Sequence, residues 1–244
     1  MEVPDPFAGF GPASPGNGVR RSPNIWDNPG TYELENTAFD RAGLLADTMR
    51  AIADWSDRDV LDVGCGTGFH LPFFGANARS VVGVEPHPPL AAIARRRTRR
   101  TANVTVLEGG AADLPLEDAS VDVAHARWAY FFGPGCEPGL EELDRVVRPG
   151  GAAFVIDNDP TRSTFGGWFR RGFPRVDPVT VESFWTDRGW QRERILTDWQ
   201  FDDHADFASV VRIELPTQVA DEVLEEHPTA TGTDYAINLW WRRF

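Results

Sequence analysis

The chain has 244 residues, with 37 acidic and 24 basic side chains and a formal net charge of −13. This length allows one α/β domain to bury its own core without metals or disulfides. The negative charge argues against a nucleic-acid partner, since nucleic-acid binding depends on neutralising phosphates. The two cysteines, Cys65 and Cys136, give neither a disulfide framework nor a zinc-binding spacing, so we expect no metal and a reducing compartment.

The amino-terminal region lacks the pattern of an export signal or a membrane anchor. It has no basic stretch followed by an apolar core, and no run in the chain approaches the roughly 20 apolar residues that span a bilayer. We therefore expect a cytoplasmic protein with no membrane partner. Residues 1–30 are rich in proline and glycine and predict a flexible leader, which leaves residues 31–244 as a single domain.

The apolar spacing predicts an alternation of helices and strands after this leader. The first helix covers Glu33–Trp55. It is followed by a strand at Val60–Val63, a helix from about Phe69, a strand at Ser80–Val84, a helix at Pro89–Arg100, strands at Val104–Leu107 and Val121–Ala126, a helix at Gly139–Val147 and a strand at Ala152–Ile156. Such an alternation predicts an α/β fold, a doubly wound parallel sheet with helices on both faces.

The second half of the chain is less regular. The Pro149, Gly150 and Gly151 run is expected to end the preceding helix. Residues 157–180 mix proline and glycine with aromatic and basic residues, which predicts an inserted loop or a short cap. The remaining predicted elements are a helix from an Asp177 N-cap to Arg188, a strand at Arg194–Phe201, helical segments over His204–Glu226 and a last strand at Ala236–Trp241.

The sequence LDVGCGTG, Leu61–Gly68, reads as a buried strand that enters a glycine-rich turn and then a helix. Glycines at this position let the backbone turn tightly and let a ligand approach where a Cβ would collide. The unpaired N–H groups of the following helix favour an anionic group there. A lone glycine triplet is also compatible with an ordinary strand-to-helix turn, so further motifs are needed.

Three further motifs occur at the ends of the next predicted strands. Glu85 ends the second strand, where an acidic side chain can accept hydrogen bonds from both hydroxyls of a ribose. The loop at 108–115 follows the third strand, and residues 125–130 leave the fourth strand at its carboxyl end. Ligands of open α/β sheets bind at this edge, so the motifs together predict a site for a nucleotide-like ligand.

In this order, the motifs resemble the class I S-adenosylmethionine-dependent methyltransferases, in particular the group called methyltransferase type 11. The resemblance covers about residues 58–156 and rests on LDVGCGTG, on VVGVEP at 81–86, on EGGAADLPLEDASVDV at 108–123 and on LDRVVRPGG at 143–151. It implies a Rossmann-like seven-stranded sheet with an antiparallel last strand, and S-adenosylmethionine as the cofactor. The cofactor-binding residues that it implies are Tyr32, Asp62, Gly64, Cys65, Gly66, Gly68, Glu85, Pro86, Gly110, Ala111 and Ala112.

Within this set, the residues from Asp62 to Gly68 are expected around the methionine part, Glu85 on the ribose and Pro86 against the adenine. Tyr32 is expected to fold over the cofactor. The chain departs from the family pattern at Gly110, where an Asp usually binds the adenine amino group. The adenine would then be recognised by the backbone amide of Ala111 and by packing, or by Asp113.

The resemblance implies methyl transfer to a small organic acceptor, through an oxygen, nitrogen or carbon atom that the sequence does not define. His125 is the candidate general base, because the unperturbed pKa of histidine lies near working pH, although a structural histidine is the alternative. Four aromatic residues after the fourth strand suit an aromatic acceptor or simple packing: Trp128, Tyr130, Phe131 and Phe132. The protein is expected to be a monomer or a homodimer.

Two other functions remain open at this stage. A non-catalytic S-adenosylmethionine-binding protein is suggested by Gly110 and by the absence of an unmistakable base. A nicotinamide-dependent oxidoreductase shares the fold and the acidic strand end. Its glycine fingerprint requires a third glycine one place later, where this chain has Phe69, so the oxidoreductase is the less favoured of the two.

Overall fold

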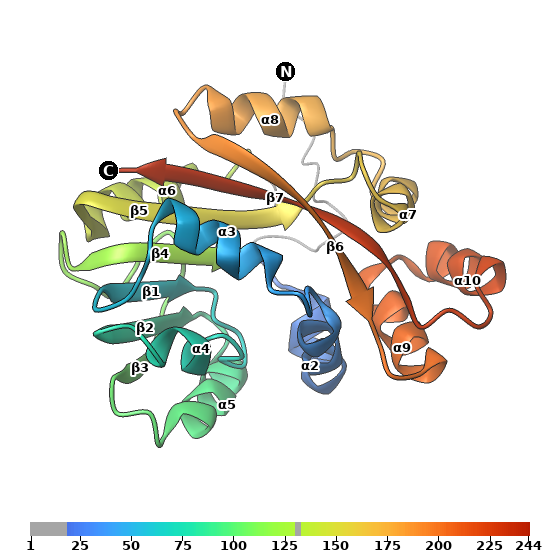
Figure 1. Ribbon diagram of the computed structural model, residues 1–244, viewed down its shortest axis with the longest axis horizontal. Helices are drawn as coiled ribbons and strands as arrows, with labels where there is room; N and C mark the ends of the chain where they lie inside the picture. The colour runs from blue at the N-terminus through green and yellow to red at the C-terminus, as the bar shows by residue number, and fades with distance from the viewer. Residues whose placement is uncertain (1–18, 130–132) are drawn as a thin grey trace.

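The computed structural model describes residues 19–129 and 133–244, whose strands form one seven-stranded sheet in the order β3-β2-β1-β4-β5-β7-β6 (Figure 1). The strands are β1 (Asp59–Val63), β2 (Ser80–Glu85), β3 (Val104–Glu108), β4 (Val121–Arg127), β5 (Val147–Asn158), β6 (Gln191–Gln200) and β7 (Gly232–Arg243). The first five pair in parallel, and β7 runs antiparallel to both of its neighbours. The predicted α/β fold with an antiparallel last strand is therefore confirmed.

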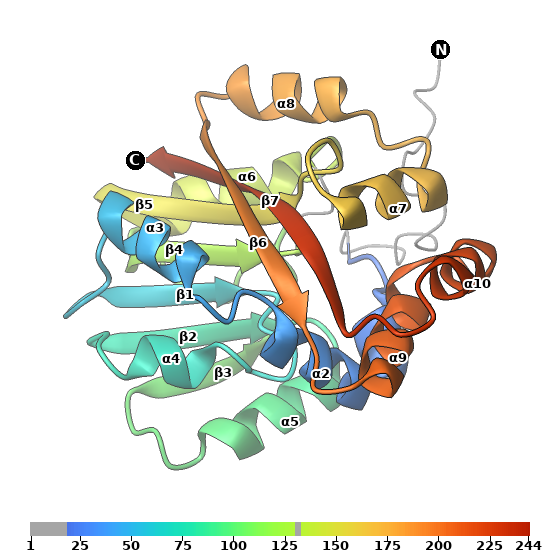
Figure 2. The ribbon, with the colours of Figure 1, turned by 45° about the vertical axis from the view of Figure 1, so that its right-hand side comes forward.

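Strand β1 lies between β2 and β4, and its side chains are buried on both faces of the sheet. Val60, Leu61 and Val63 are each no more than 1% exposed, as expected for a parallel strand covered by helices on both sides. In the register between β1 and β4, Asp62 lies beside His125. The carboxyl ends of β1, β2 and β4 point toward helix α2 in Figures 1 and 2, and this edge of the sheet carries the site.

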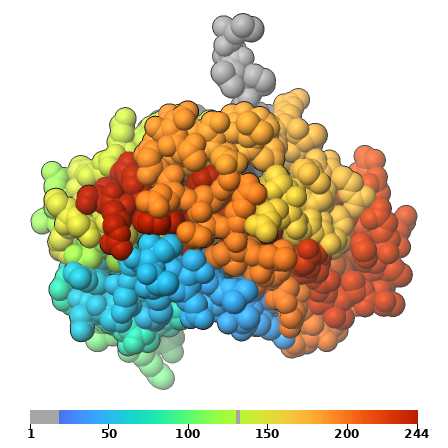
Figure 3. Space-filling model, turned by 45° about the horizontal axis from the view of Figure 1, so that its top comes forward, coloured from blue at the N-terminus to red at the C-terminus, as the bar shows by residue number. Residues whose placement is uncertain are grey.

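The helices are α1 (Pro23–Asp27), α2 (Pro29–Ala38), α3 (Leu44–Ile52), α4 (Leu71–Gly75), α5 (Pro88–Thr98), α6 (Glu137–Val146), α7 (Thr164–Gly172), α8 (Pro178–Thr186), α9 (His204–Glu214) and α10 (Thr217–Glu226). Figures 1 and 2 show α3 and α4 on one face of the sheet and α6 on the other. Helix α2 packs against α9, so the amino-terminal helices are joined to the carboxyl-terminal part of the chain. Figure 3 shows α3, in blue, beside the orange residues of β6.

The predicted single helix over Glu33–Trp55 is wrong, because two helices occupy this stretch. Asp40 has a φ of 52° and Gly43 a φ of 76°, both in the left-handed region, and the chain turns between α2 and α3. The Asp40 carboxylate stabilises the turn by accepting the N–H groups of Leu44 and Leu45. The apolar spacing of α3 continues past this turn in sequence, which is why periodicity alone joined the helices.

The predicted flexible leader over residues 1–30 is wrong for residues 23–30, which are mostly helical. Residues 1–18 lie outside the described residues, but residues 19–30 include all of α1 and the start of α2. Both helices have a proline in the first turn, where the missing N–H is not needed. Proline content therefore indicated helix starts here rather than an extended segment.

Two predictions for the later part need correction, and one is confirmed. The Pro149, Gly150 and Gly151 run does not end the helix: α6 ends at Val146, and the run lies inside β5, where the pairing with β4 shifts register. Residues 157–180, predicted as an inserted loop or a short cap, contain the regular helix α7, which corrects the loop alternative and leaves the cap as a prediction. The Asp177 N-cap is confirmed, since its carboxylate accepts backbone N–H groups at the start of α8.

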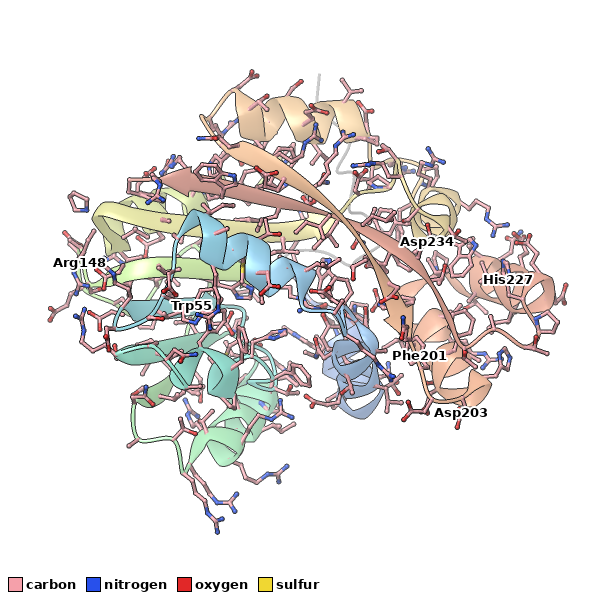
Figure 4. All side chains as sticks on the ribbon, viewed as in Figure 1. Trp55, Arg148, Phe201, Asp203, His227 and Asp234 are labelled. Atoms are coloured by element: carbon pink, nitrogen blue, oxygen red, sulfur yellow. The ribbon has the colours of Figure 1, made fainter. Side chains whose placement is uncertain are left out.

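The core extends from α3 across the sheet to α9. Figure 4 labels one core residue, Trp55, and one polar residue at the sheet edge opposite to α2, Arg148. Trp55 is fully buried against Phe74, with the Arg50 guanidinium 3.9 Å from its ring centre. Arg148 bonds Asp59 at the amino ends of the strands, opposite to α2. In the described part of the chain, no helix combines the length and the apolar character needed to cross a bilayer.

Candidate functional site

A pocket opens at the carboxyl edge of β1, β2 and β4, with a volume of about 1350 Å³ that includes its open mouth. Its lining includes many of the residues predicted from the sequence: Tyr32, Asp62, Gly64, Cys65, Gly66, Glu85, Pro86, Ala111 and Ala112. Gly68, Gly110 and His125 are not among the lining residues within the part of the chain that the structure describes. The motifs therefore meet in one pocket, apart from these three residues.

The glycine turn after β1 is required by its backbone and by its neighbours. Gly64 has a φ of 68° and Gly66 a φ of 56°, a region that side chains with a Cβ rarely adopt. A Cβ at Gly64 would lie 2.9 Å from the Cβ of Ala129, and a Cβ at Gly66 would lie 2.7 Å from Ile25. Glycine is therefore needed at both positions for the turn, and at Gly64 also for the close approach of the segment after β4.

Glu85 lies at the end of β2 with only 3% of its surface exposed. Its two carboxylate oxygens accept the backbone N–H groups of Gly66 and His87, each at 2.9 Å. Burial raises the pKa of Glu85 to about 7, although both hydrogen bonds oppose this shift. Each carboxylate oxygen can accept a further hydrogen bond, so Glu85 can receive two ligand hydroxyls from the pocket.

Asp62 and His125 form a buried pair under the glycine turn. His125 Nδ1 lies 2.7 Å from Asp62 Oδ1, and both side chains are less than 5% exposed. Since the carboxylate accepts, Nδ1 carries the proton and donates it to this bond. The ring of His125 packs against Phe74 and His70, behind the pocket wall. A function for His125 as a base stays a prediction, and the geometry favours a positioning role for it.

The amino-terminal helices cover the pocket. Trp26 of α1 stacks on the ring of His87 at 4.1 Å, with the planes 7° apart, and Ile25 lies over Gly66. Tyr32 of α2 lines the pocket, and burial raises the pKa of its hydroxyl well above its usual value. Helix α1 therefore lies over the glycine turn, and contact of Tyr32 with a bound cofactor stays a prediction.

The loop after β3 presents Ala111 and Ala112 to the pocket. Gly110 instead forms a bridge with Asp113, and the Asp113 N–H donates to the Gly110 carbonyl at 3.2 Å. Gly110 and Asp113 are absent from the pocket lining within the described residues, so the two alanines, with their backbone amides, are the groups of this loop that a ligand would meet.

Several polar residues of the pocket were not indicated by the sequence, among them Asn36 of α2 and Arg127 at the end of β4. Arg127 follows His125 by two residues on the same strand, so both side chains lie on one face. An arginine at the end of an apolar strand was the available signal. Trp128 lines the pocket as expected, whereas Tyr130, Phe131 and Phe132 lie outside the described residues.

In comparisons with known proteins, the chain is similar to methyltransferases both in its family match and in its relatives. Residues 61–155 match the family described as Methyltransferase domain. A demethylmenaquinone methyltransferase of Thermus thermophilus is 35% identical over 154 residues, which cover 60% of this chain and 70% of that protein. A tRNA U34 carboxymethyltransferase of Methylococcus capsulatus is 29% identical, with 61% of this chain and 56% of that protein covered.

Among solved structures, a putative methyltransferase of Bacillus halodurans superposes with a TM-score of 0.61 at 16% identity, over 82% of this chain and 98% of the other. At this identity the superposition supports the fold alone. The Thermus protein is the stronger argument, because the match covers more than two thirds of its length at more than 30% identity. With the motif order and the pocket, these similarities show that the chain belongs to the class I S-adenosylmethionine-dependent methyltransferases.

Proposed function

We propose that the protein transfers the methyl group of S-adenosylmethionine to a small organic acceptor, and that both molecules bind in the pocket at the carboxyl edge. The observation that carries this proposal is the extent of the pocket. It continues from Glu85 and the glycine turn to Trp128 and to Pro138 at the start of α6. The pocket therefore extends beyond the residues expected around the cofactor, to side chains after β4 and at the start of α6 that an acceptor beside the cofactor would contact.

The residues present fit the cofactor. Glu85 offers acceptor capacity for the ribose hydroxyls, and Pro86 with Ala111 and Ala112 forms a small, apolar wall for the adenine. Tyr32, Asp62 and the turn over 64–68 would surround the methionine part. Bound there, the cofactor supplies a methyl group that is already activated on a sulfonium.

The contribution of the chain is then to orient the acceptor and exclude water. Ile25 and Trp26 of α1 cover the pocket above the glycine turn. Additional apolar surface of the same pocket comes from Trp128, Pro134 and Pro138. Holding two reactants at attack distance can supply about 7–11 kcal/mol of a barrier. The apolar and aromatic lining suits an aromatic acceptor.

His125 has a positioning role in this proposal. Its 2.7 Å bond to Asp62 fixes the orientation of that carboxylate below the glycine turn, where the ammonium group of the methionine part would be. A base is needed only where the acceptor arrives protonated, and no residue of the described pocket is assigned to that task.

We further propose that the acceptor is not a nucleic acid and that residues 31–244 act as one domain, with residues 157–180 covering the acceptor side. The relatives act on unlike acceptors, since one is named for demethylmenaquinone and another for tRNA U34. The formal charge of −13 opposes a polyanionic acceptor and favours a small molecule.

The test combines cofactor binding with transfer of a labelled methyl group. Purified protein is titrated calorimetrically with S-adenosylmethionine and with NAD, then incubated with methyl-labelled cofactor and three acceptor pools: aromatic metabolites, aliphatic metabolites and bulk tRNA. We expect the protein to bind S-adenosylmethionine and not NAD. We also expect the labelled methyl group to appear in one of the two small-molecule pools. Label in tRNA contradicts the acceptor class, and binding without transfer to any pool favours a non-catalytic binding protein.

A further inference from the structure

Trp128 follows β4 in a backbone conformation that bulky residues rarely adopt. Its φ is 51°, in the left-handed region, and no other aromatic residue in the described part of the chain has a positive φ. Such a conformation is unfavourable for a large side chain and persists only where the surroundings impose it. The Trp128 N–H donates to the Ile156 carbonyl at 2.9 Å, and the residue lines the pocket. The strained residue is thus one that a ligand would touch.

The indole ring of Trp128 is held by Asn158, the last residue of β5. Trp128 Nε1 donates to Asn158 Oδ1 at 2.9 Å, and the Tyr235 hydroxyl donates to the same oxygen at 2.6 Å. Because an indole N–H can only donate, the Asn158 atom that faces it is the amide oxygen. Burial raises the pKa of Tyr235 well above its usual value, so its hydroxyl keeps the proton that it donates. Two donors on one oxygen fix the amide and, through it, the indole.

Asn158 is itself anchored, and it acts on the pocket only through Trp128. It is 6% exposed, and its backbone carbonyl accepts the side-chain amide of Asn238 at 3.1 Å. Tyr235, the second donor, stacks on Phe165 at 4.2 Å. Within the described residues, neither Asn158 nor Tyr235 belongs to the pocket lining. Any effect of Asn158 on a bound ligand is therefore carried by the position of the Trp128 ring.

The strand order places Trp128 beside the reacting end of the cofactor. Glu85 ends β2, the glycine turn ends β1 and Trp128 follows β4, and these are successive strands. The segment after β4 lies against the turn, because a Cβ at Gly64 would be 2.9 Å from the Cβ of Ala129. A cofactor with its ribose on Glu85 has its sulfonium near the turn, so Trp128 borders the space where an acceptor would meet the methyl group.

The surroundings of the Trp128 ring favour one class of acceptor. The central carbon of the Arg127 guanidinium lies 4.3 Å from the ring centre, and the ring is half-buried. A cation on the ring draws its electron density, which makes the ring a poor partner for a second cation such as an ammonium group. It remains a good partner for an electron-rich aromatic ring in offset stacking. The chemistry favours a phenol over an aliphatic amine.

We propose that an electron-rich aromatic acceptor lies against Trp128, and that Asn158 is the positioning residue that holds this surface. The inference rests on the proposed function and adds the acceptor class and the residue that adapts the pocket to it. A ring held in place in advance loses little freedom when the acceptor binds, and it keeps the acceptor at attack distance from the methyl group.

The test offers methyl-labelled S-adenosylmethionine with a pool of phenols or a pool of aliphatic amines. We expect label in the phenols, and the labelled phenol is then used alone for kinetics. Asn158→Leu should lower kcat/KM for this phenol about 10- to 100-fold, while the calorimetric Kd of S-adenosylmethionine changes less than about twofold. Asn158→Asp retains an oxygen that accepts from the indole and should recover most of the activity.

A double-mutant cycle separates positioning from general stability. Trp128→Phe removes the indole N–H, and Asn158→Leu should cause no further loss of kcat/KM in that background, because the two residues act through one contact. Trp240→Phe is the matched control. Trp240 Nε1 donates to Asp157 of the same strand at 3.1 Å, but Trp240 is not among the described residues that line the pocket. Its substitution should leave kcat/KM within about threefold.

Three results overturn the inference: label in the amines alone, equal losses from Asn158→Leu in both backgrounds, or an unchanged kcat/KM in a folded Asn158→Leu protein. Circular dichroism checks folding, and Asn158→Gln, which displaces the amide oxygen by one methylene group, replaces a Leu variant that does not fold. Failure of the proposed function looks different, because the unsubstituted protein would then label neither pool.

Discussion

Glu85→Gln separates the binding role of this residue from a structural one. In the structure the Glu85 carboxylate accepts two backbone N–H groups, from Gly66 and His87, and burial raises its pKa to about 7. Glutamine has the same shape but offers one oxygen acceptor, and its amide group faces one of the two N–H donors. The substitution therefore removes the charge that would bind ribose hydroxyls and leaves one backbone donor unpaired.

The effect on the apoprotein can be worked out from these contacts. A pKa near 7, against about 4.5 for an ordinary glutamate, means that ionised Glu85 costs folding about 3 kcal/mol above pH 7. Glutamine avoids this cost, and the unpaired N–H costs about 1–3 kcal/mol. The two terms nearly cancel or leave a net gain, so the free energy of unfolding at pH 8 should be unchanged or up to about 2 kcal/mol higher.

The effect on the cofactor has the opposite sign. Two charge-assisted hydrogen bonds to the ribose are replaced by weaker or mismatched ones, which should weaken S-adenosylmethionine binding about 10- to 100-fold. The assay is calorimetric titration at pH 8, together with thermal unfolding with and without cofactor. For a domain of this size, 1 kcal/mol corresponds to about 2–4 °C in Tm. Glu108→Gln is the control, because Glu108 is the neighbour of Glu85 in register but is paired with Arg95 at the surface.

The reverse pattern would contradict a ribose-binding role for Glu85. If Glu85→Gln lowers the Tm of the apoprotein by 10 °C or more and leaves cofactor affinity unchanged, Glu85 supports the turn and does not hold the ribose. If Glu108→Gln weakens binding as much as Glu85→Gln, the effect belongs to the general charge of this edge.

Three further predictions concern the buried ionisable groups. Since burial raises the pKa of Glu85 to about 7 and the ionised form accepts from the ribose, cofactor affinity should rise with pH up to about 7 and then level off, while apoprotein stability falls between about pH 4.5 and 7; calorimetry across this range would refute the idea if affinity were flat. His125→Phe should leave the Asp62 carboxylate without its partner, lower Tm by about 2–12 °C and weaken cofactor binding, with His125→Asn restoring part of both because its amide can donate. Glu35→Gln should reduce the loss of stability as the pH rises above about 4.5, since burial raises the pKa of Glu35 well above its usual value and the amide still donates to Glu214; equal pH profiles in urea unfolding would contradict this.

The sheet was predictable because its strands carry a local signal. Buried parallel strands such as Val60–Val63 are short apolar runs, and their order along the chain with helices between them determines the fold class. The turn at Asp40 and Gly43 was not predictable, because the apolar spacing continues across it while the backbone enters the left-handed region. Likewise, the prolines of α1 and α2 indicate either a helix start or an extended leader, and only tertiary contacts with α9 distinguish these.

The site was predictable where a motif gives both residue type and position. Glu85 and the glycine turn lie in the pocket because a strand end places them at one edge. The position of His125 depends on its register with Asp62 across two strands that are distant in sequence, which no local pattern specifies. Arg127 shares that face, and its unpaired atoms become evident only once Phe39, His70 and Trp128 surround it.

The most direct test of the central claim is a crystal structure of the protein with S-adenosylhomocysteine. We predict that the ligand lies along the carboxyl edge of β1, β2 and β4, with both ribose hydroxyls within about 3 Å of the Glu85 carboxylate. The adenine should lie against Pro86 and the backbone of Ala111 and Ala112. Ligand bound away from the glycine turn, or a ribose that does not contact Glu85, would contradict the account.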